Sequence, residues 1–331
     1  MSEASGTKWS LGGSRRYDPP ALPSGMPRRL LLAAFGAALL ACLIAAPVAL
    51  GDTFTPESGG SPNADDIDTL YKITLYVGIV IFLIVEGTLL WALFKYRGRR
   101  TGPEAAQIRG NTPLELGWTM GAALILVVLT VVTFLYLDDI ENPPPSGPNG
   151  LQASNSMFAS IDQPDPPRSG GPFLRIEVNG QQYVWRYDYP GAQTLFSYHE
   201  MVVPVDTTVV LEVTSSDVIH SWWIPKLGGK VDGVPGHVNE TWFKIPAKFA
   251  GDSFEEATVF DGQCAELCGA GHADMRAEVR AVTPDQFEQW AEEQRAAIEE
   301  AGEALAEQRE QREGSEGGGG EGGEQPEESE Q

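Results

Sequence analysis

Residues 73–94 read ITLYVGIVIFLIVEGTLLWALF, an apolar run of 22 residues interrupted by one carboxylate, Glu86. A second run of the same length, LGWTMGAALILVVLTVVTFLYL, occupies residues 116–137. As a helix each run would be about 33 Å long, and the hydrocarbon core of a bilayer is about 30 Å thick. The two runs therefore predict membrane-spanning helices at about 70–95 and 114–138. We expect Glu86 to face a partner helix or to be protonated, because an ionised side chain at this depth costs about 3 kcal/mol.

The charges that flank the two runs orient this hairpin, which we place at residues 52–138. The connecting loop carries one acid and five basic residues: Lys95, Arg97, Arg99, Arg100 and Arg109. Four acids precede the first run: Glu57, Asp65, Asp66 and Asp68. Because basic residues stay on the cytoplasmic side, the loop is expected inside and everything after the hairpin outside. The predicted location is a cell membrane, crossed more than once, with the lipid bilayer as a partner.

An earlier uncharged run covers residues 30–50, follows two arginines and ends in small residues. A basic flank, an apolar stretch and a small-residue exit are typical of a secretory signal peptide. The run is also long enough to span a membrane, so residues 1–51 are interpreted as a signal peptide or an N-terminal anchor. Cys42, after Leu39-Leu40-Ala41, loosely resembles a lipoprotein cleavage site, which leaves lipidation open.

Beyond the hairpin the composition changes twice. Residues 139–172 are rich in Pro, Gly, Ser and Asn, which predicts an extended linker. Residues 173–283 then alternate apolar and polar side chains in runs at 173–178, 207–213, 241–245, 257–260 and 275–282. Turn signals such as Asn179-Gly180 and Pro235-Gly236 separate these runs. Several short strands of this spacing predict a single β-sandwich or Greek-key barrel.

Charge and cysteine content exclude several classes of protein. The chain has 46 acidic and 23 basic residues, so its formal net charge is −23, and this argues against a nucleic-acid partner. Residues 284–331 are rich in Glu, Ala, Gln and Gly, and we expect an acidic helix followed by a disordered tail. Three cysteines exclude a disulfide-dense scaffold, and without a Cys-x-x-Cys-His motif we expect no c-type haem in this chain.

Residues 262–275 read GQCAELCGAGHADM and lie between two of the predicted strands. This loop supplies two thiols, an imidazole and a thioether, and His220 upstream supplies a second imidazole. Thiolate and thioether are soft ligands that favour copper, and imidazole also suits copper. A single-copper electron-transfer site uses one thiolate. Two cysteines four residues apart can point the same way from one loop and bridge two coppers.

Other interpretations of the same residues are open at this point. Cys264 and Cys268 can form a disulfide in an oxidising compartment, and on the pair alone that interpretation leads. A zinc site with two cysteines and two histidines is the next possibility, although it gives Met275 no role. His220 taken alone is more often an ordinary sheet histidine. The complete set of donors favours copper over these alternatives.

Over residues 52–282 the sequence resembles subunit II of the haem-copper cytochrome c oxidases, chiefly in the loop motif Cys-x-Glu-x-Cys-x-x-x-His-x-x-Met and in Asp-Val-Ile-His-Ser around His220. The resemblance implies an α+β membrane protein in which a two-helix transmembrane hairpin precedes an extracytoplasmic, cupredoxin-like Greek-key β-barrel. It also implies a dinuclear copper centre, CuA. The implied copper ligands are His220, Cys264, Glu266, Cys268, His272 and Met275.

The resemblance also implies a role for each ligand. Cys264 and Cys268 bridge the two coppers. His220 and His272 each bind one of them, and Met275 is a weak ligand to one. The remaining ligand is a backbone carbonyl group in the loop between the two cysteines.

Further site residues follow from the same resemblance. The backbone carbonyl of Glu266 binds one copper, and its side chain helps to hold a magnesium ion shared with subunit I. Glu115 matches the carboxylate at the mouth of the K proton path; considered locally, it is an acid that complements a helix N-terminus. Tyr183 stands where the family commonly has the Trp through which electrons enter, and Trp185 is a second candidate on that route. The family's acids that face cytochrome c correspond to Asp188, Asp217 and Asp232.

The implied function is that of subunit II of a respiratory cytochrome c oxidase. Cytochrome c would deliver electrons to the copper pair, which passes them to the haem and CuB of subunit I. Oxygen is reduced to water there, coupled to proton translocation, and subunit III completes the expected partners. The alternatives are the CuA subunit of a nitric oxide reductase, a membrane-tethered copper carrier, and a zinc- or disulfide-stabilised binding domain. A quinol oxidase subunit lacks the ligand set found here.

Overall fold

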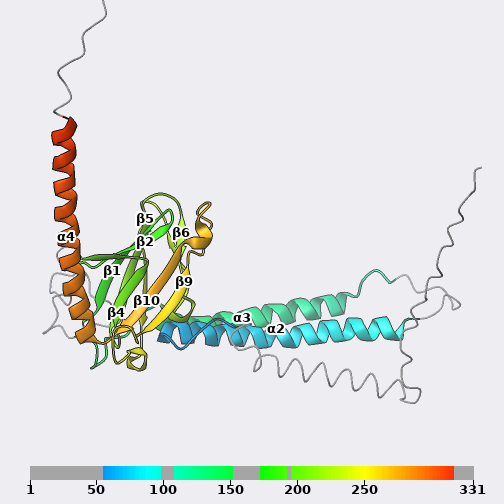
Figure 1. Cartoon of the computed structure of the whole chain (residues 1–331). Coiled ribbons are helices and arrows are strands. Elements are labelled where there is room, and N and C mark those ends of the chain that lie inside the picture. The colour runs from blue at the N-terminus through cyan, green and yellow to red at the C-terminus, as the bar shows by residue number, and fades with distance from the viewer. Residues whose placement is uncertain (1–54, 98–107, 152–171, 192–194, 317–331) are drawn as a thin grey trace, which may run out of the picture. The chain divides into compact units, whose positions relative to one another are not determined.

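The computed structural model describes residues 55–97, 108–151, 172–191 and 195–316 (Figure 1). The predicted signal peptide or anchor, most of the predicted linker and the predicted disordered tail lie outside the described residues.

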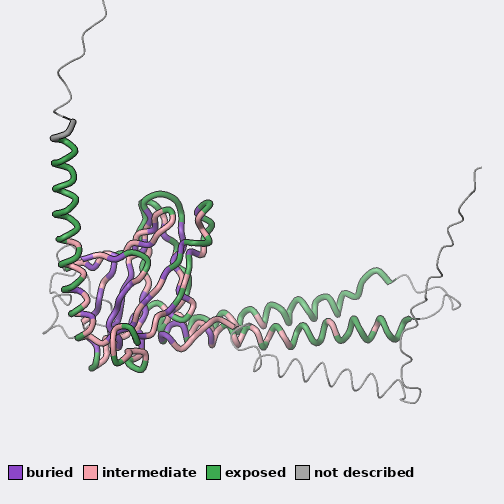
Figure 2. The backbone as a smooth tube through the Cα atoms, in the orientation of Figure 1, coloured by how far each residue is buried: buried purple, intermediate pink, exposed green. Residues whose placement is uncertain are grey.

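Two long helices, α2 (Pro62–Lys95) and α3 (Thr112–Glu141), form the predicted hairpin. In the described part of the chain these are the two helices long and apolar enough to cross a membrane. Figure 2 shows them exposed along most of their length, as expected of a surface that faces lipid or partner helices. Both helices begin earlier than the apolar runs do, because each has a proline within its first two residues, Pro62 in α2 and Pro113 in α3, which favours the first turn.

Polar residues join the start of α2 and the end of α3 to strand β8 (Asn239–Lys244). The buried Asn63 side chain donates a hydrogen bond from Nδ2 to the Trp242 carbonyl at 2.7 Å. The Trp242 indole in turn donates from Nε1 to the carbonyl of Ile140 at 2.8 Å. Ser61 accepts a hydrogen bond from the Lys244 backbone N–H at 3.0 Å. The hairpin and the β domain therefore meet in a hydrogen-bonded junction.

The β domain contains a five-stranded sheet, a three-stranded sheet and a two-stranded sheet. The first has the order β3-β2-β1-β5-β8, with β1 and β5 parallel. The second has the order β4-β10-β9, and the third pairs β6 with β7. The bounds of the strands other than β8 are β1 Leu174–Gln181, β2 Val184–Asp188, β3 Phe196–Tyr198, β4 Glu200–Pro204, β5 Thr208–Ser215, β6 His220–Trp222, β7 Val231–Gly233, β9 Thr258–Gln263 and β10 Arg276–Val282.

One core fills the space between the sheets, where Figure 2 shows the buried backbone concentrated. Large side chains from both main sheets meet there, among them Trp185, Tyr187, Met201 and Phe243, each at most 1% exposed. A membrane hairpin followed by a β-rich domain is thus confirmed. Among the described residues the sheets do not close into a barrel, so the arrangement is closer to the expected β-sandwich.

The prediction of a turn at Asn179-Gly180 is wrong. Both residues lie inside β1, and the chain turns at residues 182–183 instead. The glycine has a packing role, because a Cβ atom added to Gly180 would lie 2.8 Å from Cδ2 of His220. Glycine inside a strand often marks such a close approach.

The start of the predicted linker packs against the β domain. Ser146 Oγ donates a hydrogen bond to the Pro172 carbonyl at 2.6 Å and accepts one from the Thr208 backbone N–H at 2.9 Å. The backbone N–H of the buried Leu151 donates to Thr207 Oγ1 at 2.8 Å. Hydrogen bonds of Ser146 and Leu151 therefore hold the start of the linker against the β domain.

Helix α4 (Pro284–Glu316) is the predicted acidic helix. A capping box starts it: the Thr283 backbone N–H donates to Gln286 Oε1, and the Gln286 N–H donates to Thr283 Oγ1. Phe287 and Ala291 on its first turns are fully buried, and the Phe287 ring packs on Tyr189 at a centroid distance of 6.2 Å. After Arg295 the side chains are almost all exposed. Only the first turns of α4 belong to the core.

We expect Phe287→Ala to lower the free energy of unfolding of the β domain by about 3–5 kcal/mol, because it empties a fully buried site. Leu305→Ala is the matched control, since Leu305 lies on the same helix and is 54% exposed; it should change stability by less than about 0.5 kcal/mol. Denaturant unfolding of the full chain in detergent, followed by near-ultraviolet circular dichroism, measures both. Equal stabilities for the two variants would contradict the packing of α4 on the domain.

Candidate metal centre

The Cys-rich loop connects two paired strands. Arg276 of β10 is the register partner of Gln263 of β9, so the loop is the tip of a β-hairpin. The Cys264 backbone N–H donates to the Met275 carbonyl at 2.9 Å, which extends the ladder by one step and closes the base of the loop. Cys264 and Met275 therefore face each other across the hairpin although eleven positions separate them in sequence.

His220 reaches this loop because its strand is bonded to the same hairpin. The Gln263 N–H donates to the Trp223 carbonyl at 3.1 Å, and the Ala265 N–H donates to the Ser221 carbonyl at 2.8 Å. These two bonds place β6 beside the Cys-rich loop and leave His220 fully buried.

The side chains meet in one donor cluster, defined here as His220, Cys264, Cys268, His272, Met275 and the backbone carbonyl of Glu266. Cys264 Sγ lies 3.9 Å from Cys268 Sγ, 3.9 Å from His220 Nδ1 and 3.2 Å from the Glu266 carbonyl oxygen. Cys268 Sγ lies 3.6 Å from His272 Nδ1 and 3.9 Å from Met275 Sδ. Each sulfur thus has its own imidazole, and the predicted donors come together.

The chemistry of the donor cluster fits a metal ion. Both thiols are buried and neither forms a disulfide. Ligand atoms of His220, Cys264 and Cys268 all lie within 4.8 Å of one another, and the 3.9 Å from Cys264 Sγ to Cys268 Sγ and to His220 Nδ1 is a separation that an ion at about 2.0–2.3 Å from each donor can bridge. Burial, followed by the neighbouring Cys264 sulfur, raises the pKa of Cys268 to about 11. A positive charge beside the Cys268 sulfur favours its deprotonated form, and a bound metal would supply that charge.

Asp217 fixes the orientation of the His220 ring. Its Oδ1 lies 2.8 Å from His220 Nε2, so Nδ1 is left to face Cys264. Burial raises the pKa of Asp217, but the bond to His220 and those from the Gln182 and Val218 N–H groups outweigh it and hold that pKa at about 2. A carboxylate behind a histidine ligand sets its tautomer and raises its basicity. The sequence placed Asp217 among acids facing cytochrome c and missed this contact.

Two further groups confine His220. Gly180 lies against its ring, and an added Cβ would also approach Trp185 to 3.1 Å. The fully buried Trp185 packs edge-on to the imidazole, with centroids 5.7 Å apart. Tyr183, the other aromatic candidate, is half-buried and contacts the opposite side of the cluster, at Gly269 and Gly271.

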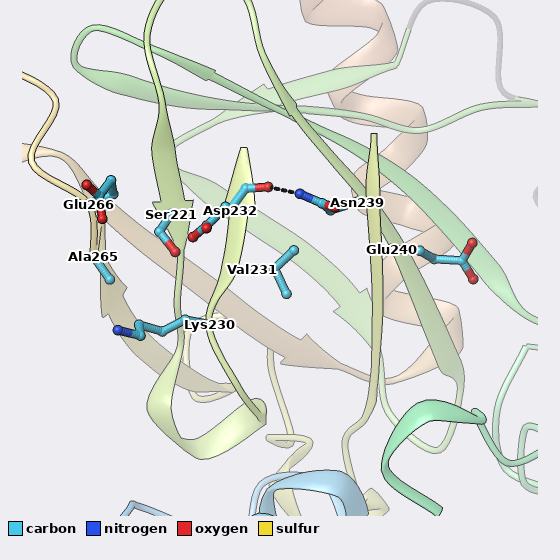
Figure 3. Close-up of a pocket in the computed structure, with 8 residues that line it drawn as sticks. All are labelled: Ser221, Lys230, Val231, Asp232, Asn239, Glu240, Ala265 and Glu266. Atoms are coloured by element: carbon cyan, nitrogen blue, oxygen red, sulfur yellow. Dashed lines mark hydrogen bonds between the residues drawn. The ribbon is translucent and has the colours of Figure 1, made fainter. Parts of the chain in front are cut away.

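Glu266 has a second environment besides the contact of its carbonyl oxygen with Cys264 Sγ. It lines a cavity of about 550 Å³, shown in Figure 3, together with Ser221, Lys230, Val231, Asp232, Asn239, Glu240 and Ala265. The lining includes three acidic residues, Asp232, Glu240 and Glu266, and one basic residue, Lys230; the Glu240 side chain extends away from the others in Figure 3. Glu266 therefore contributes in two places: its carbonyl oxygen lies beside Cys264 Sγ, and the residue also lines this cavity.

Glu115 lies outside the donor cluster, on the first turn of α3. Its Oε1 accepts a hydrogen bond from the Asn111 backbone N–H at 3.0 Å, and the Asn111 side chain accepts one from the Leu114 N–H at 3.3 Å. This reciprocal pair caps the helix, as the local interpretation of Glu115 expects. Asp188, which like Asp217 was expected to face cytochrome c, forms a salt bridge with Arg186: its Oδ1 lies 2.7 Å from Arg186 Nη2.

Comparison with known proteins identifies the family. A family model described as "Cytochrome C oxidase subunit II, periplasmic domain" matches residues 191–282, and one described as "Cytochrome C oxidase subunit II, transmembrane domain" matches residues 49–135. Cytochrome c oxidase subunit 2 of Cereibacter sphaeroides is 30% identical over 275 residues, covering 80% of this chain and 86% of that protein. The chain belongs to the cytochrome c oxidase subunit II family.

Two further proteins are similar to this chain. Cytochrome c oxidase subunit 2 of Alkalihalophilus pseudofirmus is 34% identical over 249 residues, which cover 75% of this chain and 64% of the relative. This chain therefore spans less than two thirds of that protein. A crystal structure of the periplasmic domain of subunit II of cytochrome oxidase (CoxB) of Bradyrhizobium japonicum is 36% identical and covers 38% of this chain and 94% of that chain, with a TM-score of 0.34.

Membership in the subunit II family gives the chain its location. The matched models describe a transmembrane domain and a periplasmic domain, and they coincide with the helical hairpin and the β domain respectively. The protein is therefore a membrane protein whose β domain lies on the extracytoplasmic side, as the basic loop between the apolar runs predicts.

We expect Gly180→Ala to weaken metal binding by about tenfold or more, because the added Cβ displaces His220, and changes behind a metal ligand typically have effects of that size. Gly229→Ala is the control, since its Cβ would meet only Ile67 Cδ1 at 3.7 Å, an ordinary contact. Metal retained by each full-length variant after dialysis against a copper chelator measures the effect. Retention by Gly180→Ala equal to that of Gly229→Ala would show that the close approach is unimportant.

Proposed function

We propose that this chain is the copper-bearing subunit of a respiratory cytochrome c oxidase in a bacterial cell membrane. It accepts electrons from cytochrome c at a dinuclear copper centre, CuA, and passes them to the haem-copper site of subunit I. Oxygen is reduced to water in subunit I, and the reaction is coupled to proton translocation.

The observation that carries this proposal is the arrangement of the donor cluster. Two sulfurs face each other at 3.9 Å, and each has a different imidazole beside it, at 3.9 and 3.6 Å. A single zinc ion would use all four groups and leave the Met275 thioether and the Glu266 carbonyl without a role. A pair of coppers would be held by all six groups: Cys264, Cys268, His220, His272, Met275 and the Glu266 carbonyl. Copper also prefers soft thiolate and thioether ligands.

When bound, the copper pair supplies a one-electron redox couple that two ions share. Backbone hydrogen bonds fix His220, Cys264 and Met275, because His220 lies on β6 and the other two close the base of the hairpin loop. Met275 is fully buried, as is Trp185 beside His220, and together they keep water from the site. Asp217 orients His220 through Nε2. Fixed ligands and excluded water limit rearrangement when one electron arrives or leaves.

Electrons are proposed to enter on the Tyr183 side of the donor cluster. Tyr183 is half-buried over Gly269 and Gly271 and so lies between solvent and the loop that carries Cys268 and His272. Trp185 is sealed in the core beside His220 and belongs to the inner part of the same route. The formal net charge of −23 favours a basic electron donor, whose association should weaken with salt.

Partner subunits complete the proposal. Subunit I, with haem and CuB, is proposed to cover the cavity at Glu266, where that carboxylate helps to hold magnesium; subunit III is a further partner. Glu115 is proposed to stand at the mouth of a proton path in addition to capping α3. Residues 1–51 are proposed to be a signal peptide or anchor.

Copper loading of the full chain in detergent tests the proposal directly. We expect two copper ions per chain, and an electron paramagnetic resonance spectrum in which one unpaired electron couples equally to two copper nuclei. Cys268→Ser should abolish this shared signal, because one bridging sulfur is lost. One zinc ion per chain, or the spectrum of an isolated copper, would overturn the proposal.

Met275→Leu should keep both coppers and raise the reduction potential, because losing a weak donor destabilises the oxidised form more than the reduced form. The replacement nearly conserves volume. Met201→Leu is the control, since Met201 is equally buried and lies on β4 rather than in the loop. A redox titration followed by absorption measures both potentials. Complete loss of copper from Met275→Leu would contradict a weak-ligand role.

A further inference from the structure

The turn between β1 and β2 contacts both ligand-bearing segments of the donor cluster. On one side, the Gln182 backbone N–H donates to Asp217 Oδ2 at 2.7 Å. The other oxygen of that carboxylate lies 2.8 Å from His220 Nε2. One carboxylate therefore connects this turn to the His220 ring.

The Gln182 side chain extends to the second segment. Its Nε2 donates to the Cys268 carbonyl at 2.7 Å. In the part of the chain that the structure describes, this is the only hydrogen bond that residues 266–274 receive from outside their own hairpin. The bond falls next to Gly269, whose φ of +139° is a conformation that other residues rarely adopt. It therefore holds the loop where the chain direction changes, directly beside the Cys268 ligand.

Tyr183 adds a packing contact to the same segment. A Cβ atom added to Gly271 would lie 2.5 Å from Cδ2 of the Tyr183 ring, and one added to Gly269 would lie 2.5 Å from its Oη. The ring therefore lies directly on the backbone between Cys268 and His272.

We propose that the Gln182–Tyr183 turn is a clamp that holds the two ligand-bearing segments in register, with Gln182 as a positioning residue for the copper centre. This inference rests on the proposed function. Backbone bonds from Ala265 and Gln263 already hold β6 to the base of the hairpin. The tip that carries Cys268 and His272 lacks such ladder bonds and depends on the clamp. Without the clamp, Cys268 moves relative to Cys264. The unpaired electron is then shared unequally between the two coppers, and copper is released faster.

Gln182→Leu tests the clamp because it removes the side-chain donor at nearly constant size. Gln182→Asn is the second variant: it keeps the amide but shortens the reach to the Cys268 carbonyl. Gln181→Leu is the matched control, since Gln181 is the preceding residue, has the same side chain and makes no hydrogen bond through it in the described structure. Circular dichroism of the full-length chains checks that all three fold. Gln182 is exposed, so we expect them to do so.

The measurements are the rate of copper release to a chelator and the hyperfine pattern of the copper-loaded chains. We expect both Gln182 variants to release copper at least about tenfold faster than the wild type and to show unequal coupling to the two nuclei. Gln181→Leu should match the wild type within about twofold. If the wild type binds two coppers and the Gln182 variants match it in rate and spectrum, the clamp is wrong and the function stands. If the wild type never binds a copper pair, the proposed function fails first.

Discussion

The close approach of two buried thiols controls the rest of the site. Cys264 Sγ and Cys268 Sγ are 3.9 Å apart, and burial with a neighbouring sulfur raises the pKa of Cys268. Two thiolates at this separation repel each other, most strongly where water is excluded. A cation between them removes the repulsion, and its attraction to the thiolates offsets the unfavourable free energy of ionising buried thiols. The surrounding β domain keeps the pair together, and the imidazoles and the thioether supply the remaining ligands.

Backbone hydrogen bonds, which need no metal, bring these donors together. The bond from Cys264 N–H to the Met275 carbonyl closes the loop, and the bond from Ala265 N–H to the Ser221 carbonyl adds the His220 strand. Donors fixed in this way are arranged before a metal arrives, so little binding energy is spent on ordering them. The same rigidity suits electron transfer, because donors fixed by backbone hydrogen bonds at the base of the loop would change position little between two oxidation states.

The sequence allowed the donors to be predicted but not the residues that hold them. Thiols, imidazole and thioether in one loop indicate a metal site from the sequence alone, because each group is a metal ligand. Gly180 carries no such signal, and Asn179-Gly180 favours a turn until the His220 ring is known to lie against it. Asp217 was likewise assigned to the surface, since its bond to His220 depends on a local turn. The strands β3, β6 and β7 are too short for alternation to be visible.

The indole of Trp185 has an unfavourable feature that lowers the stability of the fold beside His220. Its indole N–H is buried and has no hydrogen-bond partner among the described residues. An unsatisfied buried donor costs about 1–3 kcal/mol, and a phenylalanine would avoid that cost. The ring lies edge-on to His220 and against Gly180, where its full size excludes water from the ligand. Local violations of packing rules concentrate at functional sites. The Trp185 N–H, unpaired in the described structure, lies in such a place, beside the candidate ligand His220.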